Sequence, residues 1–408
     1  MVLKKTICIV GLGYIGLPTA SILATKGHQI IGVDVNDNII NCVKNGHSPV
    51  CEPDLDLLIK AAVNSGNLTV HKTPSPADAF IICVPTPFLD NKEADLSFVE
   101  KAGESILPYL KKGDLVILES TVPPGTTAGL LAKVISRSGL KVGEDIYVAF
   151  CPERVLPGRI LIELVSNDRI VGGINPISAE KAKEIYSSFV EGNIFLTDAT
   201  TAEMSKLVEN SYRDVNIAFA NELRKICDYM GIDVWEVISL ANRHPRVNIL
   251  NPGPGVGGHC IAVDPWFIVQ INPTLTPLIT AARNVNDSMP DYITGLINNR
   301  FKQDKPEDVT IAVLGLTYKA DVDDLRESPA LHITQKLIAQ GYNVKINEPH
   351  AHIEKLGFTS IPLDTIFNKV QAVILLVNHS IYKIIDPESL LKQNPNCFIL
   401  DTRGIWKK

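Results

Sequence analysis

Short runs of apolar, β-branched residues alternate with stretches of mixed polarity through the first third of the chain. A short apolar run bounded by turn residues is typical of a buried strand, and strands that alternate with helical stretches indicate a parallel sheet covered by helices. We therefore predict an α/β fold for this region. The expected strands are Thr6–Val10, Gln29–Val33, Ala79–Val84, Leu115–Glu119 and Tyr147–Phe150.

The middle of the chain has a different pattern. Residues 201–230 contain no proline or glycine, and Gly231 then supplies a helix stop. A helix of this length spans about 45 Å, so we predict a spine between domains or the core of a dimer. Apolar or small residues recur there at helical spacing, and the expected face holds Met204, Leu207, Val208, Ser211, Val215, Ala218 and Phe219.

The last hundred residues return to the alternating pattern and predict a second, smaller α/β unit. Ser328 followed by Pro329 is typical of a helix start, and the polar residues 302–308 form the expected linker. The chain thus divides into residues 1–199, 200–302 and 303–408. The expected strands of the last part are Val309–Leu314, Asn343–Ile346, Ala372–Val377 and Cys397–Leu400.

Composition narrows the possible partners of this chain. A net charge of -6 over 408 residues argues against binding to nucleic acid or to an anionic membrane surface. No apolar run is long enough to span a membrane, and glycines interrupt the apolar stretch after Lys4 and Lys5 that resembles a secretion signal. None of the eight cysteines lies in a CxxC pair, so we expect no metal, reduced thiols and a cytoplasmic protein.

The first expected strand runs into a glycine-rich turn, Gly11-Leu12-Gly13-Tyr14-Ile15-Gly16, and Asp34 ends the second strand. Gly11 permits a tight turn, Gly13 lets a pyrophosphate approach the backbone, and Gly16 lets the helix pack on the strand. An acidic residue at the position of Asp34 binds ribose hydroxyls and disfavours a 2′-phosphate. The pattern predicts a Rossmann domain that binds NAD.

Cys260 follows the loop Gly253-Pro254-Gly255-Val256-Gly257-Gly258-His259, which is too rich in glycine for a packed core. A loop cysteine is more often inert than nucleophilic, but these glycines allow a ligand to approach the backbone closely. Asp264 would lie near Cys260 if a helical turn begins there. A thiol beside a proton acceptor suits nucleophilic catalysis, whereas we expect the His259 side chain to point away.

Four further residues are weak candidates when each is taken alone. Lys206 and Asn210 lie four apart on the long helix and hence on one face, which is either solvated or partly buried. A desolvated lysine can stabilise an oxyanion. Thr121 and Glu153 follow expected strands, at the sheet edge where α/β proteins bind ligands.

Taken together, these motifs resemble the UDP-glucose/GDP-mannose dehydrogenase family over essentially the whole chain. The resemblance implies an N-terminal Rossmann NAD domain, a central long-helix dimerisation region and a C-terminal Rossmann-like UDP-sugar domain, in a homodimer. The matching segments, in family order, are Gly11–Gly16, Val84–Pro87, Ser120–Pro123, Pro152–Arg154, Glu203–Asn210, Gly257–Asp264 and Gly315–Ser328.

The family mechanism implies a role for each catalytic candidate. Cys260 would capture the aldehyde formed by the first oxidation as a thiohemiacetal, and a second oxidation would leave a thioester for water to hydrolyse. Lys206 would stabilise the developing negative oxygen, with Asn210 beside it. Asp264 would assist proton transfer near Cys260, and Glu153 and Thr121 would position or activate water.

The resemblance also implies binding residues, and it leaves open whether Arg243 or Arg246 reaches the partner subunit. For the cofactor they are Gly11, Gly13, Tyr14, Ile15, Gly16, Asp34, Pro85, Thr86, Thr121 and Arg326. For the substrate they are Glu153, Arg154, Val155, Lys206, Asn210, Arg243, His244, Arg246, Asn248, Gly255, Gly257, Tyr318 and Lys319.

Within the family, three segments favour UDP-N-acetyl-D-mannosamine as the substrate by their sequences: Cys151–Gly158, Asn242–Asn248 and Gly257–Trp266. The product would be the corresponding uronate, used for a bacterial surface polysaccharide. Pro157 stands where UDP-glucose dehydrogenases usually carry a second acidic residue. UDP-N-acetyl-D-glucosamine is the alternative substrate. The rival functions are a two-electron β-hydroxyacid dehydrogenase and a catalytically inactive NAD-binding regulator.

Overall fold

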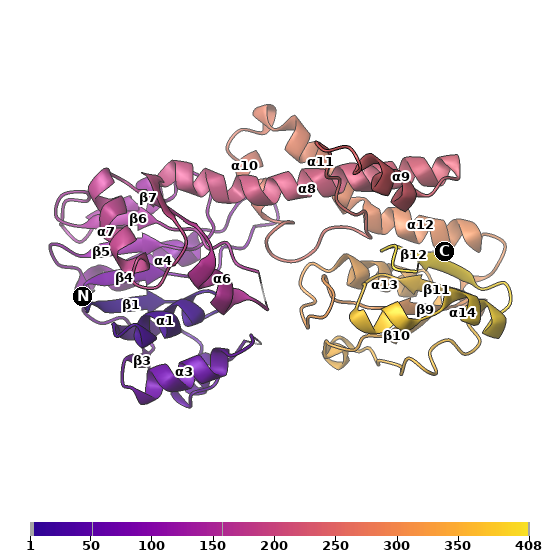
Figure 1. Ribbon diagram of the computed structural model, residues 1–408, viewed down its shortest axis with the longest axis horizontal. Coiled ribbons are helices and arrows are strands. Elements are labelled where there is room, and N and C mark those ends of the chain that lie inside the picture. The colour runs from indigo at the N-terminus through magenta and orange to yellow at the C-terminus, as the bar shows by residue number, and fades with distance from the viewer. Residues whose placement is uncertain (1–3, 51, 157, 407–408) are drawn as a thin grey trace. The chain divides into compact units, whose positions relative to one another are not determined.

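The computed structural model describes residues 4–50, 52–156 and 158–406. Pro157, on which the substrate prediction partly rests, lies outside the described residues. The chain forms two compact units (Figure 1). The first comprises residues 1–209 and 266–271, and the second comprises residues 210–265 and 272–408. The predicted division of the chain into three functional domains, with boundaries after residues 199 and 302, stays a prediction.

Within the described part of the first unit, eight strands form one sheet in the order β3-β2-β1-β4-β5-β6-β7-β8. All neighbours are parallel except β6 and β7, which are antiparallel. The strands are β1 (Thr6–Val10), β2 (Gln29–Val33), β3 (Leu68–His71), β4 (Ala79–Ile82), β5 (Leu115–Leu118), β6 (Tyr147–Phe150), β7 (Arg169–Gly173) and β8 (Ile194–Asp198).

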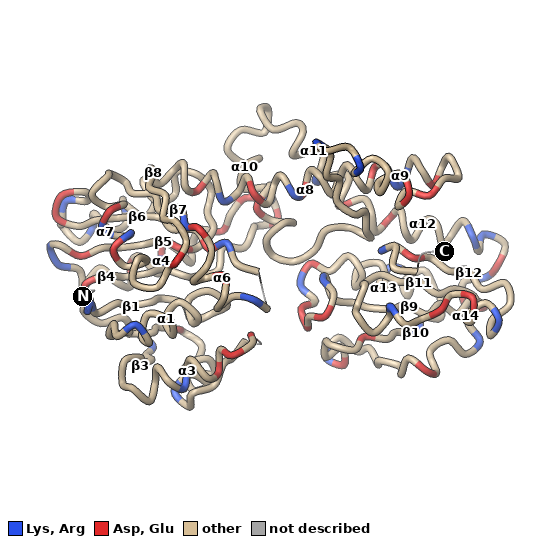
Figure 2. The backbone as a smooth tube through the Cα atoms, viewed as in Figure 1, with Lys and Arg blue, Asp and Glu red and all other residues tan. Residues whose placement is uncertain are grey.

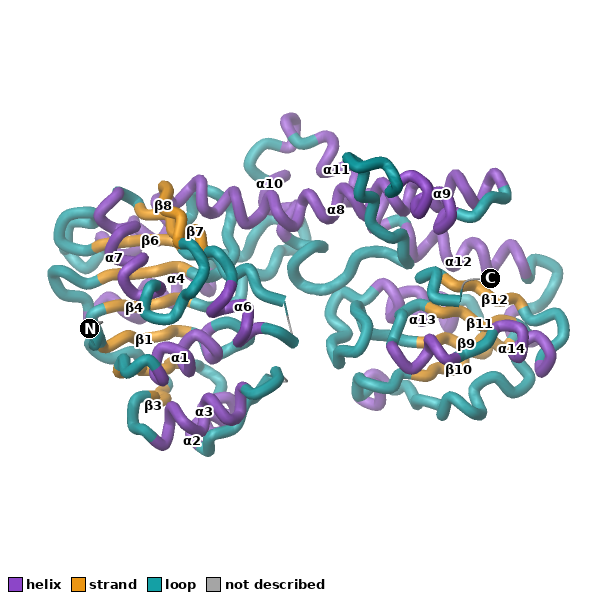
Figure 3. Tube along the Cα trace, in the orientation of Figure 1, coloured by secondary structure: helices purple, strands orange, loops and turns teal. Residues whose placement is uncertain are grey.

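Helices cover both faces of this sheet, because its central strands are apolar on both sides (Figure 3). One core packs α1 (Gly16–Thr25), α3 (Leu55–Asn64), α6 (Ile160–Ser166) and α7 (Pro176–Tyr186) against the sheet. The other packs α4 (Ser97–Ile106) and α5 (Ala132–Ser136). The short α2 spans Asp37–Lys44 and begins at an Asn36 cap.

The long helix α8 spans Ala199–Met230, and Gly231 after it has φ +72°, which confirms both the helix and its predicted stop. Only part of its predicted apolar face is buried within the chain. Leu207, Ser211 and Ala218 are buried, but Val208 and Phe219 are about half exposed, at 50% and 51%. Helical spacing alone cannot tell a face that packs within the chain from one left for another partner.

The second unit contains a parallel sheet of four described strands in the order β10-β9-β11-β12. These are β9 (Thr310–Leu314), β10 (Asn343–Asn347), β11 (Ala372–Leu375) and β12 (Phe398–Asp401). The core on one face includes α12 (Met289–Arg300) and α13 (Pro329–Ala339), and the core on the other includes α14 (Pro387–Gln393). The remaining helices are α9 (Val234–Ala241), α10 (Asp264–Val269) and α11 (Pro277–Asp287).

The α/β architecture is confirmed, and so are the bounds of β1, β2 and β6. The predicted strands Ala79–Val84 and Ala372–Val377 end two residues earlier than expected, where their chains turn into loops. The Ser328 side chain accepts a hydrogen bond from Leu331 N, which confirms the predicted helix start. Among the described residues, no helix is long and apolar enough to cross a membrane.

Cationic and anionic residues are interspersed along both units (Figure 2). A buried ion pair in the second unit joins α11 to α8. Arg283 Nη1 lies 2.6 Å from Asp214 Oδ1 on α8, and both side chains are almost completely buried. Asn286 Nδ2 donates to the same carboxylate at 2.8 Å, and Asn221 Nδ2 donates to Asn286 Oδ1 at 2.8 Å. This network fastens α11 to α8.

We expect Arg283→Met to lower the free energy of unfolding by about 3–5 kcal/mol, because it leaves the Asp214 carboxylate buried without its cation. Urea unfolding followed by circular dichroism measures the change. The control is Arg137→Met, which removes an exposed pair with Glu104 and should cost less than about 1 kcal/mol. Equal effects of the two variants would contradict this assignment.

Candidate active site

The turn after β1 has the geometry that a dinucleotide-binding loop requires. Gly11 has φ +97°, and a Cβ on Gly16 would lie 1.9 Å from Gly11 O, so neither position accepts a side chain. By contrast, a Cβ on Gly13 would meet no atom within 4 Å. The backbone at Gly13 is therefore accessible to a ligand, as the pyrophosphate of NAD would need.

Asp34, directly after β2, is the acidic residue of this site. Its Oδ2 accepts a hydrogen bond from Leu12 N at 2.9 Å, and its Oδ1 accepts one from Asn36 N at 2.9 Å. The carboxylate is half-buried and each oxygen retains a further lone pair, so it fits the ribose hydroxyls of NAD. Tyr14 and Ile15, in the turn after β1, are half-buried.

The loops after β4 and β5 are bound to each other at the same edge of the sheet. Thr86 Oγ1 donates to Thr121 O at 2.6 Å, and Ser120 Oγ donates to Val84 O at 2.7 Å. The structure thus brings together Pro85, Thr86 and Thr121, which the sequence predicted separately as site residues.

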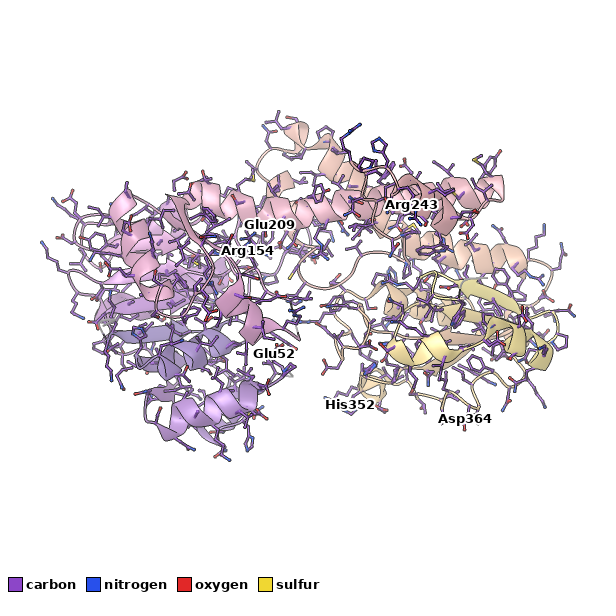
Figure 4. The ribbon with its side chains drawn as sticks, in the orientation of Figure 1. Glu52, Arg154, Glu209, Arg243, His352 and Asp364 are labelled. Atoms are coloured by element: carbon purple, nitrogen blue, oxygen red, sulfur yellow. The ribbon has the colours of Figure 1, made fainter. Side chains whose placement is uncertain are left out.

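Glu153 lies in the loop after β6 and is 9% exposed. Its Oε1 accepts Arg154 N at 2.6 Å, and its Oε2 lies 3.3 Å from Arg169 Nη2. Arg154 pairs with Glu209 at 2.6 Å and donates to Asp168 O (Figure 4). A cavity of about 10 Å³, near the size of one water, is lined by Pro152, Glu153, Arg154, Glu163, Asn167, Asp168 and Arg169.

Lys206 and Asn210 occupy successive turns of α8, as predicted, and Lys206 is half-buried. Glu203, one turn earlier, accepts Gly125 N at 2.5 Å and Thr127 N at 2.7 Å. Its buried carboxylate thereby caps the helical segment that follows Thr121, and burial raises its pKa. In the first unit, α8 thus anchors a loop of the predicted site.

In the second unit, the structure confirms the helical turn predicted next to Cys260. Asp264 N donates to Cys260 O at 2.9 Å where α10 begins, and Cys260 itself is exposed. Asn210 Nδ2 donates to Asp264 Oδ2 at 2.6 Å, and both residues are buried. Two predicted catalytic residues from distant parts of the sequence are therefore in direct contact.

The glycines before Cys260 pack closely against the loop after β9. A Cβ on Gly257 would lie 2.5 Å from Glu327 O and 2.9 Å from Tyr318 Cβ. Gly258 has φ +80°, and its N donates to Arg326 O at 3.2 Å. The glycine loop therefore packs against Tyr318. The neighbour of Tyr318, Lys319, is half-buried.

Arg326 forms a fork with its near neighbour Asp324, with Nη2 to Oδ2 at 2.6 Å and Nε to Oδ1 at 2.9 Å. Burial alone would raise the pKa of Asp324, but the hydrogen bonds from Arg326 hold it below its usual value. The predicted contact of Arg326 with the cofactor stays a prediction.

The segment Asn248–Gly255 is fastened to α8 by amide side chains. Asn216 binds both Asn248 O, at 3.2 Å, and Leu250 N, at 2.8 Å. Asn221 Oδ1 accepts Gly253 N at 2.8 Å. The segment just before it, which holds the predicted Arg243, His244 and Arg246, is exposed.

Sequence reasoning missed Arg403, which follows β12. Its Nε donates to Asn378 Oδ1 at 3.2 Å, and its Nη1 lies 2.5 Å from where a Cβ on Gly253 would stand. Burial lowers the pKa of this guanidinium. Its place after the predicted strand Cys397–Leu400, at the carboxyl edge where ligands bind, was a signal available in the sequence.

One cluster of described residues has the spacing of metal ligands, namely Asp321, His350 and His379, whose ligand atoms lie within 4.8 Å of one another. However, His379 Nδ1 accepts Asp321 N at 2.9 Å, and Nε2 lies 3.3 Å from Glu348 Oε2. Both ring nitrogens are engaged within the protein, so we interpret the cluster as a clamp between loops.

The first unit has a glycine-rich turn suited to a dinucleotide and an acidic residue that fits a ribose. The second unit has an exposed cysteine after a glycine-rich loop. Together these features define a nucleotide-dependent oxidoreductase. Sequence comparison agrees. Residues 5–190 match the NAD binding domain of the UDP-glucose/GDP-mannose dehydrogenase family, residues 200–288 match its central domain, and residues 312–408 match its UDP binding domain.

Individual relatives match almost end to end. The chain is 50% identical to a UDP-N-acetyl-D-mannosamine dehydrogenase of Methanocaldococcus jannaschii, over 99% of this chain and 94% of that one. It is also 50% identical to an NDP-N-acetyl-D-galactosaminuronic acid dehydrogenase of Ralstonia nicotianae, over 98% and 96%. The structure of a UDP-D-ManNAc dehydrogenase from Pyrococcus horikoshii matches with a TM-score of 0.93 and 40% identity, over 99% and 96%.

The chain belongs to the UDP-glucose/GDP-mannose dehydrogenase family. It is an NAD-dependent UDP-sugar dehydrogenase, and its first domain is the NAD-binding domain of that family. The resemblance inferred from the sequence motifs is thereby confirmed.

The contact between Gly258 and the Tyr318 ring gives a test. A Cβ at Gly258 would lie 2.8 Å from Tyr318 Cε2, at a φ that disfavours a side chain. We expect Gly258→Ala to displace the Cys260 loop and to lower kcat by up to about 100-fold, with NAD affinity unchanged. Steady-state rates and NADH fluorescence measure the two quantities.

The matched control is Gly129→Ala, because a Cβ there would meet no atom within 4 Å. If Gly258→Ala retains full kcat, the packing of the Cys260 loop against Tyr318 does not matter for catalysis.

Proposed function

We propose that this protein oxidises UDP-N-acetyl-D-mannosamine to UDP-N-acetyl-D-mannosaminuronate. The observation that carries the chemistry is the placement of Cys260 one helical turn before Asp264, whose buried carboxylate binds Asn210. The choice of sugar is supported by relatives named UDP-N-acetyl-D-mannosamine dehydrogenase that are 47–50% identical to this chain.

The Gly11–Gly16 turn and Asp34 would hold NAD, which would supply the hydride acceptor for both oxidations. The Cys260 thiolate adds to the aldehyde carbon after the first and holds it as a thiohemiacetal, which becomes a thioester in the second. Water then attacks the thioester carbon, the carbon–sulfur bond breaks and the thiolate leaves. One alcohol, two NAD and one water thus give one carboxylate, two NADH and three protons.

Charged and polar side chains have separate tasks in this scheme. Lys206 stabilises the oxyanion, with Asn210 beside it on the same face of α8. Asp264 takes the thiol proton from Cys260. Glu153 receives the proton of the attacking water, and Thr121 orients that water.

The substrate is held mainly by residues of the second unit. Arg403 binds the diphosphate, because its guanidinium fork matches pairs of phosphate oxygens. Lys319 binds the substrate phosphate or sugar through its ammonium group. Tyr318 and the segment Asn248–Gly255 line the UDP-sugar. We further propose that the enzyme acts in the cytoplasm, where Cys260 would stay a reduced thiol.

Counting NADH per sugar tests this proposal. With UDP-N-acetyl-D-mannosamine limiting and NAD in excess, we expect two NADH per sugar, and little from UDP-N-acetyl-D-glucosamine, UDP-N-acetyl-D-galactosamine or UDP-glucose. Cys260→Ser should lose at least about 1,000-fold in the overall rate, since an alcohol is a far weaker nucleophile than a thiolate.

Each other outcome has a distinct meaning. Preference for another N-acetylated sugar would overturn the substrate but keep the mechanism. One NADH per sugar, or undiminished turnover by Cys260→Ser, would overturn covalent capture. Absence of turnover with every sugar would favour the inactive NAD-binding regulator.

We also propose that the protein is a homodimer that pairs through α8. Tyr212, Phe219 and Ile226 recur at every second turn of this helix and are 66%, 51% and 47% exposed. An apolar stripe of this spacing is the seam that two helices bury against each other. Tyr229, 93% exposed, extends the same stripe.

We expect the double variant Phe219→Lys and Ile226→Lys to convert the dimer into monomers, because two added cations cannot be buried in an apolar seam. Light scattering after gel filtration should show a mass falling from twice 44.6 kDa to 44.6 kDa. Ile338→Lys, at an exposed apolar position on α13, is the control that should remain dimeric. A wild-type monomer would refute the dimer.

A further inference from the structure

A buried charge network lies behind Glu153 in the first unit. Arg169, the first residue of β7, has a side chain that is 5% exposed and places Nη2 3.3 Å from Glu153 Oε2. Its Nη1 lies 3.7 Å from Cys151 Sγ, and its guanidinium stacks on Tyr186 at 5.0 Å. A buried arginine that is packed this closely holds one orientation.

The sheet topology explains how Arg169 reaches Glu153. Because β7 runs antiparallel to β6, with Ala149 opposite Gly173 and Phe150 opposite Gly172, continuing this register brings Arg169 opposite Glu153. β7 and β8 both run opposite to β1–β6, so the first residue of β7 lies at the edge where β1–β6 end. The carboxyl edge of the sheet thus receives a cation.

A second carboxylate belongs to the same network. Glu119, at the end of β5, is 3% exposed, and it accepts Tyr186 Oη at 2.5 Å and Cys83 Sγ at 3.1 Å. Burial raises the pKa of Glu119, and the Arg169 charge opposes that rise. One buried cation therefore faces two buried carboxylates, and Glu153 is the one that it contacts.

We propose that Arg169 is a positioning residue that holds the Glu153 carboxylate in place as the base for thioester hydrolysis, while Glu119 competes with Glu153 for the same cation. This inference rests on the function proposed above. The other ionisable groups around Glu153 are Arg154, which is paired with Glu209, and Glu163 and Asp168, which line the same cavity.

The sign of the effect follows from charge. A cation in contact with a carboxyl favours its ionised form. Without Arg169, hydrolysis should therefore require a higher pH. Glu119→Gln removes the competing anion, so Arg169 acts on Glu153 alone and hydrolysis should extend to lower pH.

The experiment measures the decay of the Cys260 acyl-enzyme against pH. The thioester is formed in a single turnover with excess NAD, quenched in acid and counted by intact-protein mass spectrometry. We expect Arg169→Gln to move the acid limb of the decay rate up by about 1–3 pH units, to accumulate acyl-enzyme at neutral pH, and to leave the formation of two NADH intact.

Three variants separate charge from structure. Arg169→Lys keeps the cation and should restore most of the wild-type profile, even if Arg169→Gln folds poorly. Glu119→Gln should move the limb in the opposite direction, which structural damage would not do. Arg137→Gln, which removes an exposed pair with Glu104, should leave the profile unchanged.

An unchanged limb in Arg169→Gln, or limbs that move the same way in Arg169→Gln and Glu119→Gln, would overturn the positioning role. Titration of the Glu153 carboxyl by ¹³C NMR, assigned with Glu153→Gln, tests the same shifts without substrate. If wild-type protein forms no acyl-enzyme, the proposed function fails, and this titration still decides whether Arg169 controls Glu153.

Discussion

Both units depend on one interaction, in which a carboxylate after the second strand accepts a backbone N–H from the glycine turn after the first. In the first unit, Asp34 accepts Leu12 N at 2.9 Å. In the second, Glu348 accepts Leu316 N at 2.6 Å. Gly11 and Gly315 open these turns with φ +97° and +86°, so the chain can leave the strand and present its N–H groups to the carboxylate.

The same arrangement serves two purposes because the carboxylates differ in what else they bind. Asp34 is half-buried and keeps lone pairs for a ribose. Glu348 is buried and accepts four backbone N–H groups, besides facing His379 Nε2 at 3.3 Å. Burial would raise its pKa, but these hydrogen bonds hold it below the usual value. Glu348 therefore fixes the turn that leads to Tyr318 and Lys319, and it has no capacity left for a ribose.

The local sequence pattern was sufficient to predict those elements that form because of their own residues and the turns beside them. β1 and β2 are apolar runs that end at turn residues, and their bounds were predicted correctly. β8 was missed, because its residues Ile194–Asp198 are only partly buried and lack a continuous apolar run. The apolar face of α8 was predicted from its helical period, but the period could not tell which of its residues are buried within the chain. Val208 and Phe219 are half exposed, because exposure depends on what lies opposite the helix.

The same distinction holds for the residues of the candidate site. Asn210 and Asp264 could each be proposed from their neighbours in sequence, and the structure joins them at 2.6 Å. Arg169 could not be proposed in this way. Its contact with Glu153 depends on the reversed direction of β7, which no residue near either position encodes. β7 supplies a cation to the Glu153 carboxylate from inside the core, where both side chains are shielded from solvent and their attraction is stronger than it would be at the surface.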